Sequence, residues 1–285
     1  VGTSNSTAGN NIGLGNQALF CNISGGGNIA VGSQVLEKNL TGFLNVALSC
    51  NALYNNTTGA CNIAIGHNAL YCNTTFNTSI AIGRMAGYQA TCGPNIMIGE
   101  HAGCIINGAQ NTIVGQNAGK QSTEATGNSF FGQCAGYYNS TGDRNAYVGC
   151  RAGYGNTTGS FNIAFGVIAG PQTCGATGSY NVTFGYKSGC SLTSGSCNIF
   201  IGTQAGNTIS SGCRNIAIGR DVELPSATGD DQFAIGCGTG RWIAGDSSFN
   251  TTLAGLSTAK SDGTFLSKQS VVSGIATVCT KLNIP

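Results

Sequence analysis

A five-residue pattern recurs along most of the chain: Asn, apolar, small, apolar, Gly. It reads NIGLG at 11–15, NIAVG at 28–32 and NIAIG at 62–66. Its last position falls at Gly15, Gly32, Ser49, Gly66, Gly83, Gly99, Gly115, Gly132, Gly149, Gly166, Gly185, Gly202, Gly219 and Gly236. Successive steps are 17 residues, apart from two of 16 and one of 19. Such a regular period indicates a tandem-repeat architecture.

The length of the unit limits the architecture. A helical-pair repeat needs about 33 to 47 residues and a propeller blade about 40, whereas one coil of a solenoid can be shorter. The motif alternates as a strand does, and segments such as Ala18-Leu19 and Ala52-Leu53 predict a second short strand in each coil. We therefore predict an all-β fold, a β-solenoid (β-roll) of about fourteen 17-residue coils over residues 1–240. Residues 241–285 lie outside the repeat and are expected to be a C-terminal cap or an assembly connector.

The two faces of the predicted strand differ in composition. The fourth motif position is always large and apolar, so we expect it to face the core, and we expect the motif asparagines to stack in a ladder. The third position then points outward, yet it carries no charge. One interpretation is an exposed strand with inert small residues. The other is an assembly face that another chain covers. The predicted residues of this face are Ala64, Ala81, Ile113, Phe130, Tyr147 and Phe200.

The repeated unit resembles two known groups of proteins. The NIAIG unit is similar to the head repeats of trimeric autotransporter adhesins, and its combination with Ala-Gly and Asn-Thr-Thr-Gly segments resembles the repeat regions of phage tail fibres. The resemblance covers residues 1 to about 240, and the stretch RWIAGDSSFNTTLAG resembles the region that closes such tail-fibre arrays. It implies an extracellular, self-associating adhesive or structural rod. The 17-residue unit is longer than an adhesin head coil, and cysteines are foreign to both groups.

The composition argues against catalysis and against several partners. Charged residues make up 8% of the chain, the formal net charge is +2, and there is no basic block to neutralise phosphates, so we expect no nucleic-acid partner. The one acidic cluster is Asp221, Glu223, Asp230 and Asp231; calcium binding is the alternative there, but we expect these side chains to solvate the end of the array. With two histidines and no carboxylate group in an earlier coil, we expect no catalytic residues, no cofactor and no metal site. No run of 18 apolar residues occurs, so we expect no membrane insertion.

Fourteen cysteines without a Cys-x-x-Cys pair favour disulfides in an oxidising compartment. The chain begins at Val1 without a signal-peptide pattern, so we expect a mature or partial chain that is secreted, extracellular or on the cell surface. Equal phase in adjacent coils predicts the bridges Cys134–Cys150 and Cys197–Cys213, and Cys174–Cys190 more weakly. The alternative is free cysteine that fills core space.

Glycosylation sequons recur in phase with the repeat. Six lie seven residues after a motif glycine, and two more are candidates near the ends; the predicted N-glycosylation sites are Asn5, Asn22, Asn39, Asn56, Asn73, Asn139, Asn156 and Asn250. The alternative is that Asn-Thr-Thr-Gly serves as turn chemistry. Asn181 is itself a motif asparagine, so we expect it to be buried and unmodified.

These observations predict an extracellular structural or adhesive repeat protein that self-associates into a fibre or oligomer. The partner is a further copy of the chain, with surface glycans as a second candidate. One alternative is an ice-binding solenoid with a hydroxyl column at Thr7, Ser24, Thr41, Thr58, Thr75, Thr141 and Thr158. The other alternative is a phage-type tail-fibre receptor-binding protein.

Overall fold

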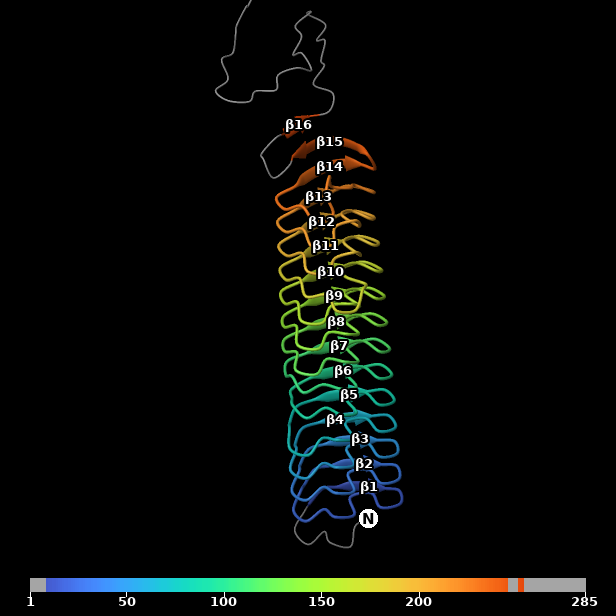
Figure 1. Ribbon diagram of the computed structural model, residues 1–285. Helices are drawn as coiled ribbons and strands as arrows, with labels where there is room; N and C mark the ends of the chain where they lie inside the picture. The colour runs from blue at the N-terminus through green and yellow to red at the C-terminus, as the bar shows by residue number, and fades with distance from the viewer. Residues whose placement is uncertain (1–8, 246–250, 254–285) are drawn as a thin grey trace, which may run out of the picture.

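The chain forms an elongated rod of stacked coils (Figure 1). The computed structural model describes residues 9–245 and 251–253. The strands are β1 (Ile12–Leu14), β2 (Ile29–Val31), β3 (Val46–Leu48), β4 (Ile63–Ile65), β5 (Ile80–Ile82), β6 (Ile96–Ile98), β7 (Thr112–Val114), β8 (Ser129–Phe131), β9 (Ala146–Val148), β10 (Ile163–Phe165), β11 (Val182–Phe184), β12 (Ile199–Ile201), β13 (Ile216–Ile218), β14 (Phe233–Cys237), β15 (Gly240–Gly245) and β16 (Thr251–Leu253). The predicted all-β solenoid is thus confirmed. The described residues contain no helix, and hence no helix that could cross a membrane.

All strands belong to one sheet in chain order. From β1 to β14 the pairing is parallel, and each motif position pairs with the same position of the next coil, as Ala47 does with Ala64. The 19-residue unit keeps this register because Thr173, Cys174 and Gly175 form an exposed loop. After β14 the pairing becomes antiparallel through β15 and β16, where the repeat also ends in the sequence.

The wall opposite the sheet is made of turns. Residues two and four after the motif glycine have left-handed backbone conformations, for example Asn51 at φ 57° and Leu53 at φ 52°. An extended strand requires negative φ, so the expected second strand per coil is wrong. The turns still bond to the next coil, because Leu36 N donates to Ala52 O at 3.1 Å and Leu53 N to Ala69 O at 3.0 Å.

Close approach of neighbouring coils explains the motif glycine. Gly66 has φ +135°, and a Cβ built on it would lie 2.6 Å from the carbonyl carbon of Gly83 in the next coil. A side chain at Gly66 would therefore push adjacent coils apart, whereas Ser49 occupies the same corner in its coil at φ 93°.

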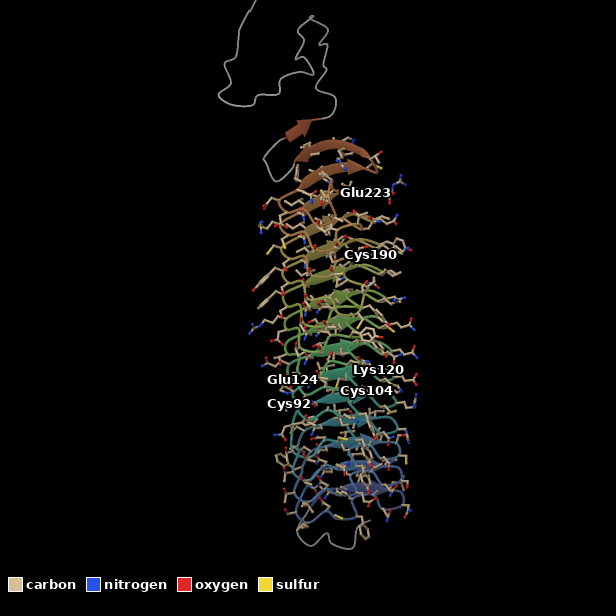
Figure 2. The ribbon with its side chains drawn as sticks, viewed as in Figure 1. Cys92, Cys104, Lys120, Glu124, Cys190 and Glu223 are labelled. Atoms are coloured by element: carbon tan, nitrogen blue, oxygen red, sulfur yellow. The ribbon has the colours of Figure 1, made fainter. Side chains whose placement is uncertain are left out.

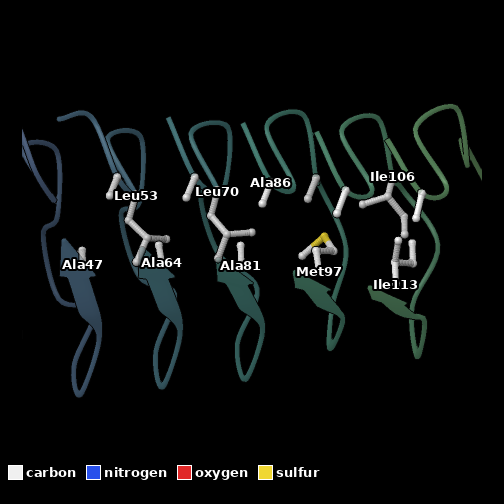
Figure 3. Packing of buried hydrophobic residues seen from close by; sticks show 14 of the residues in the cluster. Ala47, Leu53, Ala64, Leu70, Ala81, Ala86, Met97, Ile106 and Ile113 are labelled. Carbon is white, nitrogen blue, oxygen red and sulfur yellow. The ribbon is translucent and has the colours of Figure 1, made fainter. Parts of the chain in front are cut away.

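The third motif position faces the core. Figure 3 shows Ala47, Ala64 and Ala81 pointing from their strands toward Leu53 and Leu70 of the opposite wall. The predicted assembly face is therefore wrong: its six members are fully buried inside the rod, namely Ala64, Ala81, Ile113, Phe130, Tyr147 and Phe200. Because successive side chains of a strand alternate between faces, the fourth position, expected in the core, lies on the outer face instead.

The predicted asparagine ladder is confirmed. Along the array the backbone N–H at the first motif position donates to the side-chain oxygen at that position of the preceding coil, for example Asn45 N to Asn28 Oδ1 at 2.9 Å, and Ser79 and Gln232 replace asparagine in two coils. The Nδ2 atom of Asn45 also donates to Gly59 O at 2.8 Å. These bonds satisfy polar groups that the stacked coils bury.

Candidate functional site

The outer face of the sheet carries apolar side chains along the length of the rod. It consists of the second and fourth motif positions of β1–β14, and we call it the outer face. Its second-position residues are Ile12, Ile29, Val46, Ile63, Ile80, Ile96, Thr112, Ser129, Ala146, Ile163, Val182, Ile199, Ile216 and Phe233. Its fourth-position residues are Leu14, Val31, Leu48, Ile65, Ile82, Ile98, Val114, Phe131, Val148, Phe165, Phe184, Ile201, Ile218 and Ile235.

These side chains are apolar and open to solvent. All lie in the half-buried or exposed classes, and Leu14, Phe165 and Phe184 are 66%, 47% and 50% exposed. Among the residues of this face only Thr112 and Ser129 carry a polar side-chain atom. A monomeric soluble protein seldom leaves so long an apolar stripe in water. The face therefore has the chemistry of an interaction surface.

Charged groups next to this face are neutralised among themselves. Residues that directly follow the motif glycines form a polar ladder in which Arg84 Nε donates to Glu100 Oε1 at 2.8 Å and Gln116 Nε2 to Glu100 Oε2 at 3.0 Å. Hydrogen bonds from Arg84 and Gln116, together with the charge of Arg84, lower the pKa of Glu100. The carboxylate thus stays ionised and paired beside the apolar columns rather than within them.

The sequon asparagines form a second buried ladder. Asn39 Nδ2 donates to Asn22 Oδ1 at 2.7 Å and to Gly42 O at 2.9 Å, and Asn56 Nδ2 donates to Asn39 Oδ1 at 2.7 Å. The side chains of Asn22, Asn39, Asn56, Asn73, Asn139 and Asn156 are fully buried. A glycan on Nδ2 would replace these contacts, so the burial of these six asparagines argues against sugar there in the folded rod, and their glycosylation stays a prediction.

The remaining sequons differ from these. Asn5 and Asn250 lie outside the described residues. Asn181 is a buried member of the motif ladder, as expected. Asn77, in the sequon Asn77-Thr78-Ser79, is exposed at a turn.

All thirteen described cysteines are free thiols in this structure, and Cys279 lies outside the described residues. Figure 2 shows Cys104 and Cys190 on one side of the rod and Cys92 on the other. Cys150 Sγ lies 3.7 Å from Oε1 of Gln133, the residue before Cys134, so this predicted pair occupies neighbouring coils. Cys174 lies in the exposed loop, and Cys190 O instead accepts a bond from Gln172 N. All three predicted bridges stay predictions.

A stacked tyrosine column lies on the turn side. The ring centroids of Tyr54 and Tyr71 are 5.2 Å apart at an interplanar angle of 3°, and those of Tyr71 and Tyr88 are 5.3 Å apart. The ring faces cover one another, so they are not presented for stacking on a sugar. This column gives no support to surface glycans as partners.

The described residues hold no group of three or more His, Cys, Asp or Glu side chains that could bind a metal ion. The exposed carboxylates of Asp230 and Asp231 both contact Arg214, at 3.3 and 2.7 Å. They neutralise a guanidinium at the C-terminal end of the array.

No protein-family model, curated protein or solved structure matches the chain. The outer face was not expected from the sequence, although one pattern in the sequence indicates it. Every leucine that stands four residues after the last motif position accompanies a small third position, as Leu53 does Ala47, and every large third position is accompanied by glycine there, as Phe130 is by Gly136. Only residues that share one core need such compensation.

Proposed function

We propose that the protein is an extracellular structural or adhesive rod that self-associates through its outer face. The observation that carries the proposal is the pair of uncharged apolar columns running the length of β1–β14. The resemblance of the repeat unit to adhesin heads and tail-fibre repeats supports an extracellular rod of this kind.

The size of the face suits a second copy of the chain. At a strand spacing of about 4.8 Å, fourteen strands extend for roughly 60 Å, and two columns of side chains cover a width of about 12 Å. The resulting area of roughly 700 Å² approaches the 800 Å² or so that each partner buries in a standard interface. Apolar side chains that pack face to face would gain the free energy of leaving water.

The composition of the face also favours a flat apolar partner. A charged ligand would find no counter-charge among the outer-face residues of β1–β14. Phe165 and Phe184 stack with ring centroids 4.9 Å apart, which adds a broad aromatic patch to the C-terminal half of the face. An identical face on another copy meets both requirements without any further protein.

The experiment measures particle mass by light scattering at micromolar concentration. We expect the native protein to form dimers or larger particles, and Ile65→Glu with Ile98→Glu to dissociate them, because each charge would be desolvated against an apolar partner. The Kd should rise at least tenfold per charge. The matched control is Thr58→Glu with Thr75→Glu, which places the same charges on exposed turns and should leave the mass unchanged. A native monomer would contradict the proposal.

Ice binding is a second candidate with one observation in its favour. Ser24, Thr41, Thr58 and Thr75 are exposed and recur once per coil. The column is a single residue wide, because the neighbouring Thr57 hydroxyl already donates a hydrogen bond to Thr74 O at 2.9 Å. Thermal hysteresis in a dilute solution would favour this candidate, and its loss in Thr41→Val with Thr58→Val would locate the site.

A further inference from the structure

One turn of the rod carries a column of side chains that accept hydrogen bonds from the backbone of the preceding coil. The column lies six residues before the motif glycine. Its bonds are Thr126 N to Asp143 Oδ1 at 2.7 Å, Asp143 N to Ser160 Oγ at 2.9 Å, Ser160 N to Ser179 Oγ at 3.0 Å and Ser179 N to Ser196 Oγ at 3.1 Å. We call these positions the acceptor column.

Cys213 stands in the acceptor column where its neighbours have oxygen. Its Sγ lies 3.3 Å from the backbone N of Ser196, the residue immediately before Cys197. The backbone N of Arg214 donates to Ser196 O at 3.0 Å, which sets the two segments side by side. The sulfur of Cys213 therefore rests against the peptide that leads into Cys197.

The positions of Cys197 and Cys213 are diagonal neighbours in adjacent coils, and the side chains at the equivalent two positions one coil further on are in contact. Arg214 occupies the position of Cys197 in the next coil, and Asp230 occupies that of Cys213. Arg214 Nη2 and Asp230 Oδ2 are 3.3 Å apart. A spacing of about 4.8 Å between coils and about 3.8 Å between consecutive Cα atoms puts the Cα atoms of Cys197 and Cys213 roughly 6 Å apart. Disulfides join Cα atoms at about 5.5–6 Å.

We propose that Cys197 and Cys213 form an oxidisable dithiol, and that its oxidation makes a disulfide bond between the coils of β12 and β13. The oxidant is a low-molecular-weight disulfide. The thiolate of the exposed Cys197 attacks one sulfur of this small disulfide and releases one small thiol. Cys197 is then joined to the other half of the reagent as a mixed disulfide. The thiolate of Cys213 then attacks Cys197 Sγ and releases the second small thiol. Two protein thiols are oxidised, and one small disulfide is reduced to two thiols.

The chain contains a matched control. Cys61 occupies the same position in its coil as Cys197, it is also exposed, and their φ values are 58° and 60°. Its acceptor-column neighbour is Asn77, whose Oδ1 accepts from Ala60 N at 2.6 Å as Cys213 Sγ does from Ser196 N. Cys61 is thus exposed to the same reagent in the same backbone geometry as Cys197, but its neighbour is the Asn77 amide instead of a thiol. Its reaction should stop at the mixed disulfide.

The test treats the full chain with oxidised glutathione, blocks the remaining thiols at low pH and maps peptides without reduction. We expect a Cys197–Cys213 link without glutathione at either residue, and glutathione retained on Cys61. In Cys213→Ser, Cys197 should retain glutathione. In Asn77→Cys, Cys61 should instead link to the introduced thiol. The link should also raise the melting temperature by a few degrees relative to oxidised Cys213→Ser, because it closes a loop of one coil.

Two results would overturn the proposal. One is glutathione retained on Cys197 in the native protein, and the other is a link from Cys197 to any other cysteine, including one in a second chain that appears as doubled mass on a non-reducing gel. The reaction occurs within one chain, so it is independent of self-association. A monomer that forms the link would contradict the proposed function alone.

Discussion

Phe130 and Gly136 fit each other across the core of one coil. A Cβ built on Gly136 would lie 2.6 Å from Cε2 of Phe130, and Phe130 is fully buried. Two strands of the array with alanine at the third position, β3 and β4, have Leu53 and Leu70 at the place of this glycine. In these coils the sheet and the opposite wall therefore share the width of the core between them.

This compensation predicts that a paired exchange is tolerated better than either half. Phe130→Ala should lower the free energy of unfolding by about 3–5 kcal/mol through the cavity it leaves. Gly136→Leu alone should be destabilising because the new side chain overlaps Phe130. The double variant recreates the pattern of Ala47 and Leu53, whose leucine adopts φ 52°, and should recover part of the loss in urea unfolding. A double variant less stable than both single variants would contradict the compensation.

Charge on the two faces of one strand should have opposite consequences. Ala81 is fully buried, whereas Ile82 lies on the outer face. Ala81→Glu should collapse the circular dichroism signal or lower the melting temperature strongly, because it buries an unpaired charge. Ile82→Glu should keep the β-rich spectrum. Equal loss of structure in both variants would remove the distinction between core and outer face.

The position of each sequon predicts where sugar attaches. When the chain is made in a glycosylating host, Asn77 should carry a glycan and Asn39 should not, because Asn39 Nδ2 is used in the buried ladder. Enzymatic deglycosylation followed by mass spectrometry would detect conversion to Asp. As a control, Thr41→Ala removes the sequon of Asn39 while leaving its ladder intact, and should leave the glycan mass unchanged. Modified Asn39 in folded protein would refute the ladder.

Two surface carboxylates predict a loss of stability in acid. The pKa of Glu100 is lowered by its bonds to Arg84 and Gln116, and that of Asp231 by its bond to Arg214. A lowered pKa in the folded state contributes stability that is present above the unfolded pKa and is lost as the pH falls through the folded pKa. The urea concentration at the unfolding midpoint should therefore decrease when the pH is lowered below the ordinary carboxylate range. The double variant Glu100→Gln with Asp231→Asn should show a smaller decrease. Exposure keeps the change small, and an unchanged pH profile in the double variant would contradict it.

The sequence by itself determined the architecture. A 17-residue period is short enough only for a solenoid coil, and the motif asparagines could be expected to stack because equal positions in adjacent coils become neighbours. The same periodicity located the end of the parallel array, which β15 and β16 close by antiparallel pairing. These features depend on local pattern and repetition, which one chain displays directly.

Only the tertiary structure decided which side of each strand is inside. The second, third and fourth motif positions are all largely apolar, so alternation fixes that neighbours point oppositely but not which set is buried. The answer came from the opposite wall, whose left-handed turns place leucine or glycine against the third position, as Leu70 and Gly136 show. The same wall buries Asn39 in a ladder that its sequon does not reveal. Burial depends on what the chain folds against, and that partner is distant in the coil rather than adjacent in the motif.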